Sequence, residues 1–176
     1  MKKKLNNYTK AFLGLIFIIA ALLMYVPDAM SAEKQVAGWV ENVILFPGNL
    51  EVKAKLDTGA RHSSLNADHI EEFERDGATW VRFKLKNWKG RTVSMEARVV
   101  RLAVIKQIGA PSVSRPVIRL GICLGNVYKD VEVNLEDRGK FNYQMLIGRS
   151  FLRHSILVDP SATFTVKPSC QGIIPK

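Results

Sequence analysis

The sequence has few of the residues that build metal and redox sites. Its 176 residues include only two cysteines and three histidines. Cys123 and Cys170 do not form a CxxC pair, and neither an HExxH motif nor a Gly-Lys-Ser/Thr phosphate loop occurs. These absences argue against a zinc ribbon, a thioredoxin-type redox site, a zinc protease and a P-loop nucleotide site. We therefore expect neither a metal ion nor a cofactor.

Acidic residues are scarce relative to basic ones. Lys and Arg number 26 against 16 Asp and Glu, which gives a formal net charge of +10. Such a balance suggests nucleic acid, an anionic membrane surface or an acidic substrate. The basic residues alternate along predicted strands and do not form runs with interleaved aromatics, so we expect no nucleic-acid partner.

The length suits one domain, preceded by a targeting segment. Residues 1–32 begin with three lysines, continue with an uncharged apolar stretch at 11–26, and end in small residues at 29–32. This order is typical of a secretory signal, and the stretch is shorter than the roughly 20 residues of a transmembrane helix. We expect an exported protein, periplasmic after cleavage or anchored in the inner membrane through this segment alone. Residues 33–176 then form the folded domain.

Export leaves the state of the two cysteines open. In an oxidising compartment, Cys123 and Cys170 can form one disulfide, and the alternative is two buried free thiols.

Strand patterns dominate the domain. Residues 50–57 alternate strictly between apolar and polar positions, which predicts a half-buried strand that ends at Asp57. Similar alternation predicts two hairpins, one at 81–86 and 93–99 and one at 118–124 and 131–135. Many short strands with close turns indicate an all-β domain, a single closed or partly closed β-barrel.

Helical patterns are confined to two short segments. We expect one helix at 67–76, behind Asn66 as a cap and before Gly77, and a short helical turn near 149–155. Prolines 111 and 116 predict a loop at 106–115.

The chemistry is concentrated where the first alternating strand ends. The residues after it read Asp57-Thr58-Gly59-Ala60, and a glycine two positions after a carboxylate lets the backbone approach it closely. Alone, this triplet is also typical of an ordinary turn. Much later, Met145–Arg149 (MLIGR) places an apolar run before a glycine.

Together these two elements resemble the retropepsin-like aspartic proteases. The resemblance spans roughly residues 36–168, and the segments DTGARHSSL and MLIGRSFL are similar to the bacterial branch labelled ATP-dependent zinc proteases. The resemblance implies the retropepsin fold, a β-barrel with one or two short helices. It also implies aspartic chemistry. The zinc label fits these residues poorly, because the three histidines form no HExxH motif.

The resemblance assigns Asp57 as the catalytic residue. Two carboxylates a few ångströms apart share a proton, so that one activates water as a base and the other protonates the scissile carbonyl. A single DTG motif supplies one carboxylate, so we expect a homodimer in which each chain contributes Asp57 across a two-fold axis.

The other site residues are assigned as supporting or substrate-binding groups. By resemblance, Thr58 hydrogen-bonds across the dimer, Gly59 and Ala60 hold the backbone near the carboxylates, and Ile147 and Gly148 pack behind the loop. Substrate contacts are expected from Arg61, His62, Trp88 and Arg149. Trp88 is expected at a flap tip, with a packed turn residue as the alternative. For Arg149 we favour an ion pair with a buried carboxylate, a structural role.

These patterns predict an exported aspartic endopeptidase. Its substrates are peptides or proteins, and the resemblance favours acidic, glutamate-rich peptides, because some relatives of that branch are linked to glutamate ligases. The alternative is a non-catalytic periplasmic peptide-binding or accessory module on the same barrel, in which Asp57 is only a turn residue.

Overall fold

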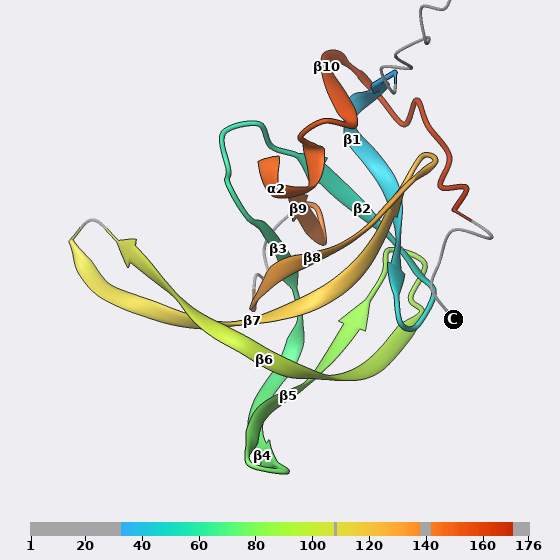
Figure 1. Ribbon diagram of the computed structural model, residues 1–176. Coiled ribbons are helices and arrows are strands. Elements are labelled where there is room, and N and C mark those ends of the chain that lie inside the picture. The colour runs from blue at the N-terminus through green and yellow to red at the C-terminus, as the bar shows by residue number, and fades with distance from the viewer. Residues whose placement is uncertain (1–32, 108, 138–141, 171–176) are drawn as a thin grey trace, which may run out of the picture. The chain divides into compact units, whose positions relative to one another are not determined.

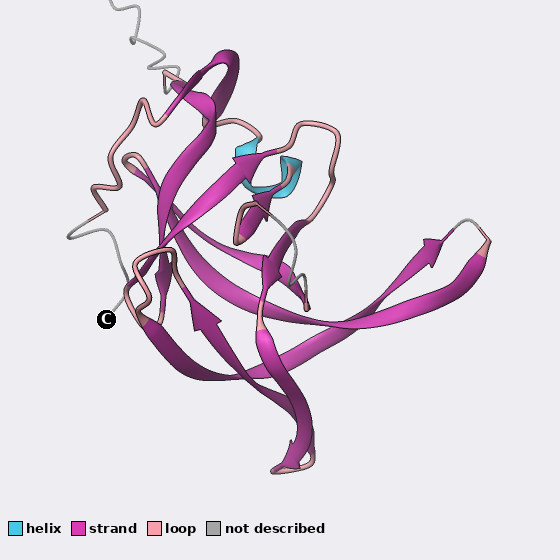
Figure 2. Cartoon of the chain, turned by 180° about the vertical axis from the view of Figure 1, so that it is seen from behind, coloured by secondary structure: helices cyan, strands magenta, loops and turns pink. Residues whose placement is uncertain are grey.

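The structure, a computed structural model, describes residues 33–107, 109–137 and 142–170. The chain divides into two units, residues 1–32 and 33–176, and the expected export segment lies outside the described residues. The second unit is built almost entirely from strands (Figures 1 and 2). Its elements are β1 (Gln35–Phe46), β2 (Leu50–Leu56), β3 (Ser63–Asn66), β4 (Asp68–Arg75), β5 (Ala78–Lys86), β6 (Thr92–Gln107), β7 (Ala110–Leu124), β8 (Val127–Glu136), β9 (Met145–Ile147), α2 (Arg149–Leu152) and β10 (Ile156–Thr163).

Six strands close into a ring. Their order is β1-β2-β9-β3-β8-β7, and β7 pairs with β1 to complete it. The pairs β2–β9 and β3–β8 are parallel, and the other pairs in the ring are antiparallel. Strand β10 pairs with β1 outside the ring, and β6, β5 and β4 extend from β7. The predicted all-β class is therefore confirmed, with α2 as the one helix of the described residues.

The alternating pattern of β2 shows why the ring forms. Leu50, Val52 and Ala54 are buried in the core, and Lys55 between Ala54 and Leu56 points outward. Burying each larger apolar side chain contributes about 1.5–3 kcal/mol, which holds the strand in this register. The core also contains Leu45, Leu65, Phe83, Ile118, Leu120, Ile122, Leu135, Met145, Ile147 and Phe151. The predicted strand at 50–57 is confirmed.

Both predicted hairpins are also confirmed. Strand β5 pairs antiparallel with β6, and β7 pairs antiparallel with β8. Val81, Phe83 and Leu85 are buried, while Arg82 and Lys84 between them are exposed, as alternation requires.

The helix expected at 67–76 is wrong, because the segment forms β4. Its less exposed residues, Ile70 and Phe73, are three positions apart, and this spacing imitates a helix. The cause is a bulge between Asp68 and Glu71, where His69 has φ of 52° and the two-residue alternation is interrupted. The segment is a strand and not a helix because its backbone pairs with β5.

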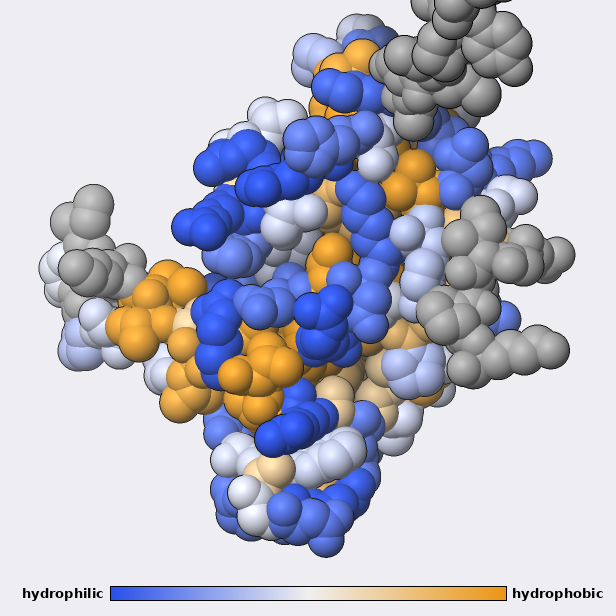
Figure 3. Space-filling model, in the orientation of Figure 1, coloured by the Kyte–Doolittle hydropathy of each residue, from blue (hydrophilic) through white to orange (hydrophobic). Residues whose placement is uncertain are grey.

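The loop expected at 106–115 is wrong as well. Strands β6 and β7 continue past the ring as a long two-stranded hairpin, which projects from the rest of the domain in Figure 1. Pro116 is tolerated because each strand of this ribbon is an edge strand, which needs no partner on its outer side. Val100, Leu102, Val104 and Val113 leave apolar surface exposed along this hairpin (Figure 3). The short helical turn expected near 149–155 is confirmed as α2.

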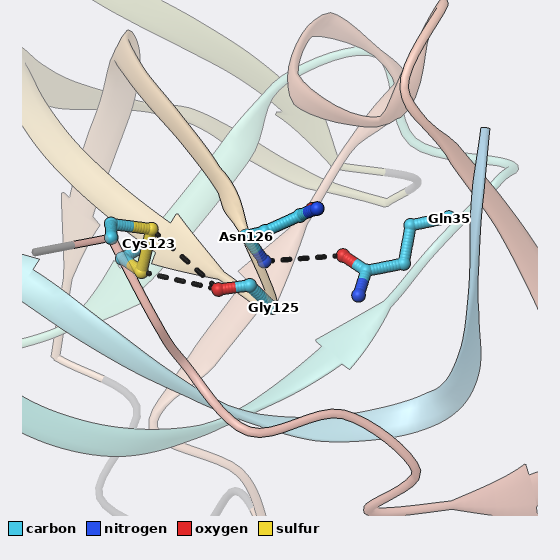
Figure 4. The surroundings of a disulfide bond; sticks show 5 residues. Gln35, Cys123, Gly125 and Asn126 are labelled. Atoms are coloured by element: carbon cyan, nitrogen blue, oxygen red, sulfur yellow. Dashed lines mark hydrogen bonds between the residues drawn. A yellow bond between two sulfur atoms is a disulfide. The ribbon is translucent and has the colours of Figure 1, made fainter. Parts of the chain in front are cut away.

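The open question about the cysteines is answered by a disulfide. Cys123, at the end of β7, is bonded to Cys170, beyond β10, across a Cα–Cα distance of 6.0 Å. The carbonyl of Gly125 beside it accepts a hydrogen bond from the Ser169 N–H at 2.6 Å. Figure 4 shows the next residue, Asn126, whose N–H donates a hydrogen bond to Oε1 of Gln35. The chain after β10 is therefore tied back to the ring.

In the parts of the chain that the structure describes, no helix has the length and apolar character needed to cross a membrane.

Candidate active site

Asp57 emerges from the ring at the end of β2. The Leu56 side chain before it is 4% exposed, and the Asp57 N–H donates to the Ile147 carbonyl at 2.8 Å. This bond continues the parallel pairing of β2 with β9, in which Leu56 lies opposite Ile147. The two sequence elements that suggested the site, DTGA and MLIG, are therefore adjacent strand ends.

The carboxylate of Asp57 is oriented by the backbone of its own turn. Its Oδ1 accepts hydrogen bonds from the N–H groups of Gly59 at 2.9 Å and Ala60 at 3.1 Å. Its Oδ2 lies 3.9 Å from Nζ of Lys55, and the Asp57 side chain is 27% exposed. One oxygen is thus held by two donors, and the other faces a cation at a partly open surface.

Gly59 and Gly148 let the backbone pack tightly around this turn. A Cβ on Gly59 would lie 3.2 Å from Oδ1 of Asp57, and one on Gly148 would lie 2.5 Å from the His62 carbonyl oxygen. The segment after Gly148 also donates to the turn, from Arg149 N–H to the Ala60 carbonyl at 2.9 Å. The structure therefore places Gly148 and Ile147 directly behind the Asp57 turn.

Arg149 lies against the same turn through its side chain. Its Nη1 donates to the carbonyls of Thr58 at 2.9 Å and Gly59 at 2.7 Å. The contacts are with backbone carbonyls, where a buried carboxylate was expected. They brace the turn from the outside.

Arg61 and His62 line a separate hollow of about 540 Å³ together with Arg101 of β6 and Glu132 of β8. Partial burial lowers the pKa of His62, and the positive charges of Arg101 and Arg61 lower it further, with Glu132 acting in the opposite direction. His62 therefore lies in a positive electrostatic environment.

The structure does not bring Trp88 to the Asp57 turn. Lys53 and Lys89 place their Nζ atoms 5.3 and 5.0 Å from the centre of its ring. The turn is held against the start of β2, where Asn87 donates to the Glu51 carbonyl at 3.1 Å and Lys89 pairs with the Glu51 carboxylate. Trp88 is thus a turn residue that is 36% exposed and contacts Lys53 and Lys89, and the projecting hairpin is β6–β7.

Sequence reasoning missed a pocket of about 360 Å³ that is lined by Lys55, whose Nζ lies 3.9 Å from Oδ2 of Asp57. We call it the Lys55 pocket; its lining includes Trp39, Lys55, Ser64, Tyr143, Met145 and Leu146. Trp39 and Tyr143 meet edge to face, with ring centres 5.9 Å apart. Alternation along β2 does place Lys55 on the outer face, but Trp39 and Tyr143 come from distant segments that only the fold brings together.

The described residues contain no group of three or more His, Cys, Asp or Glu side chains arranged to hold a metal ion. The candidate site consists of the Asp57 carboxylate, the donors of its turn, and two hollows, one lined by Arg61 and His62 and the other by Lys55 and Ser64.

The family model that matches residues 36–169 is RimB-like, described as retropepsin-like aspartic endopeptidase RimB. The chain belongs to this family. Membership is consistent with the ring of strands and with the position of DTGA against MLIG. The resemblance to the retropepsin-like family predicted from these motifs is therefore confirmed.

Known relatives of this RimB-like chain support the same relationship. A Legionella pneumophila protein of unknown function, known from its crystal structure, is 37% identical, with a TM-score of 0.66 over 77% of this chain and all of that one. Proteins named "probable alpha-L-glutamate ligase" from Shewanella pealeana and Shewanella halifaxensis are 38% and 36% identical over 77% of this chain. A ligase-named protein from Desulfotalea psychrophila is 33% identical over 62% of this chain.

These names contradict the predicted aspartic endopeptidase activity, and its non-catalytic alternative with it. The curated relatives are named for joining glutamate, and the chain spans only 30% of the two Shewanella proteins. The physical reason is that DTGA and MLIG specify how two strand ends meet, and one fold hosts more than one reaction. Both the relatives and the family description indicate an enzyme.

Proposed function

We propose that this chain is an enzyme of α-glutamyl peptide chemistry. It binds a peptide or protein that carries glutamate, and Asp57 moves the proton at the reacting amide. The observation that carries the proposal is the geometry of Asp57, whose Oδ1 is held by two backbone N–H groups while Oδ2 lies 3.9 Å from Nζ of Lys55, a residue that lines the Lys55 pocket. Glutamate is proposed as the substrate residue because the relatives are named probable alpha-L-glutamate ligase.

The carboxylate can perform this proton transfer because its orientation is set before substrate arrives. The Gly59 and Ala60 N–H groups fix Oδ1, and Arg149 braces the carbonyls of the same turn. A positioned carboxylate accepts a proton from the attacking nucleophile and returns it to the leaving group. An amine nucleophile corresponds to the ligase names of the relatives; the accepting carboxyl group is then activated by ATP, so that the amide bond forms as phosphate leaves and Asp57 takes up the amine proton. Water corresponds to the aspartic-type hydrolase of the family description, which is the second candidate.

The test is a product analysis of glutamate-tailed peptides by mass spectrometry. The full chain is incubated with a peptide that ends in several glutamates, with and without added glutamate and ATP, and with a chelator in parallel. We expect mass changes in steps of one or more glutamate residues, abolished by Asp57→Asn and absent for a glutamine-tailed peptide. A gain of mass assigns ligation and a loss assigns hydrolysis. Conversion of the peptide by Asp57→Asn at the wild-type rate would contradict the role of Asp57.

We also propose that the active form is a homodimer with one Asp57 from each chain. Support comes from the chemistry, because an acid and a base must act together and each chain contributes one DTG motif. Sedimentation of the full chain with and without a glutamyl peptide tests this. A monomer under conditions where the peptide is converted would contradict it.

Export to an oxidising compartment is a further part of the proposal. It is supported by the Cys123–Cys170 disulfide, because structural disulfides are rare where thiols are kept reduced, and by the targeting pattern of residues 1–32. Fractionation of cells that express the full chain, followed by thiol labelling, tests it. Recovery in the reduced cytosolic fraction alone would contradict it.

A further inference from the structure

We propose that the Lys55 pocket is the binding site for a glutamate side chain of the substrate, and that Lys55 recognises its carboxylate. This inference rests on the proposed function and adds the residues that select glutamate. Three observations support it: the walls of the pocket, the Lys55 ammonium in its lining, and the 3.9 Å between that ammonium and the Asp57 carboxylate.

The walls of the pocket suit a short aliphatic stem. The Trp39 and Tyr143 rings stand at 85° to each other with their centres 5.9 Å apart, and Leu146 lies in the same lining. Aromatic and aliphatic surfaces of this kind favour methylene groups over water. The cavity of about 360 Å³ is large enough to admit a side chain rather than a single water.

A cation stands at the edge of this apolar pocket. The Lys55 side chain is 46% exposed, and its Nζ is 3.9 Å from Oδ2 of Asp57. This separation exceeds a charge-assisted hydrogen bond of about 2.7–2.9 Å, so the ammonium keeps donors for a second carboxylate. An exposed ion pair of such length also contributes little stability, so its rearrangement on binding costs little.

Glutamate combines the two features that the pocket offers. Its methylene stem fits the apolar walls, and its carboxylate accepts hydrogen bonds from the Lys55 ammonium. Glutamine has the same shape without the charge, so it loses the charge-assisted bond. Lys55 lies in β2, and Asp57 follows the last residue of that strand, two positions later. A glutamate whose carboxylate is bound by Lys55 therefore lies next to the reacting carboxylate of Asp57.

The chain offers a matched control in Lys53. It lies on the same outward face of β2, but its Nζ lies over the rings of Trp88 at 5.3 Å and Phe164 at 5.6 Å, outside the Lys55 pocket. Removing its charge changes the net charge as much as removing that of Lys55. A general electrostatic effect would therefore appear equally in both variants.

The experiment compares binding of glutamyl and glutaminyl peptides by isothermal titration calorimetry. The full chain is used as wild type, Lys55→Met and Lys53→Met, with thermal unfolding as a check of the fold. We expect wild type to prefer the glutamyl peptide by roughly tenfold to a hundredfold, the range that a hydrogen bond to a charged group supplies. Lys55→Met should lose this preference while keeping its affinity for the glutaminyl peptide, and Lys53→Met should retain it.

The outcomes separate this inference from the proposed function. Unchanged preference in Lys55→Met, with wild type still converting glutamyl peptides, overturns the pocket assignment alone. Equal binding of both peptides by wild type, together with no conversion of either, overturns the proposed function as well. A second variant, Lys55→Glu, should reverse the charge requirement and bind a lysyl peptide better than a glutamyl one. A Lys55→Glu variant that still prefers the glutamyl peptide would contradict the inference.

Discussion

The fully buried carboxylate of Glu41 accepts hydrogen bonds from both the N–H and the hydroxyl of Thr165, at 2.8 and 2.7 Å. The N–H groups of Gly38 and Val166 also donate to it. Glu41 lies in β1, and Thr165 lies beyond β10, more than a hundred residues later. One carboxylate therefore joins the first strand to the C-terminal segment of the domain.

Replacing this carboxylate should destabilise the domain. We expect Glu41→Gln to lower the free energy of unfolding by about 3 kcal/mol, because an amide nitrogen would face donors that lose their charged acceptor. Urea unfolding of the full chain measures the change. Glu72→Gln, at an exposed position of β4, is the control and should cost less than about 0.5 kcal/mol. Equal stability of the two variants would contradict the role of Glu41.

Gly148 and Gly59 should tolerate a methyl group differently. A Cβ at position 148 meets backbone at 2.5 Å, so Gly148→Ala must displace residues 61–62 and should cost about 3 kcal/mol. At position 59 the nearest atom is a carboxylate oxygen at 3.2 Å, which can move slightly. Gly59→Ala should therefore unfold near the wild-type urea concentration but lower activity, because Asp57 shifts. The reverse ranking in stability would show that the turn is not packed as described.

Loss of the disulfide should destabilise the domain without changing its fold. The bond closes a loop of 47 residues, and the chain-entropy model assigns such a cross-link about 4 kcal/mol. We expect Cys170→Ser, and wild type treated with a reductant, to unfold at similarly reduced urea concentrations. A reductant that leaves the wild-type transition unchanged would argue that the two thiols are not bonded in solution.

The pKa of His62 should lie below the ordinary histidine value of 6.5. Burial and the charges of Arg101 and Arg61 lower its pKa from 6.5, so the native state binds this proton less readily than the unfolded chain. The contribution of His62 to stability is therefore complete above pH 6.5 and decreases as the pH falls from 6.5 through the lowered pKa. NMR titration of its ring measures the pKa directly. Arg101→Met should raise it, and a value unchanged in that variant would contradict the electrostatic cause.

The sequence could predict the elements that carry strict alternation. In β2, Leu50, Val52, Ala54 and Leu56 reveal the buried face, so the strand and its end at Asp57 follow from the pattern alone. The same holds for the β5–β6 and β7–β8 hairpins. The alternation pattern gave a wrong prediction at β4, because a bulge at His69 leaves the less exposed residues Ile70 and Phe73 three positions apart, the spacing expected of a helix. No local pattern distinguishes such a bulge from a helical turn, because its pairing partner lies in another strand.

The alternating strand patterns by themselves determined the all-β class, and the DTGA and MLIG motifs determined the family and placed Asp57 at the end of a strand. Only the tertiary structure decided which distant residues surround that carboxylate. Trp39, Lys55 and Tyr143 share one pocket because β1 pairs with β2, with Val40 opposite Lys55, and β9 lies parallel to β2. Trp88 stays away because its turn is held on Glu51. Local sequence encodes the face of each strand, whereas the neighbours of that face depend on long-range pairing, which no short segment contains.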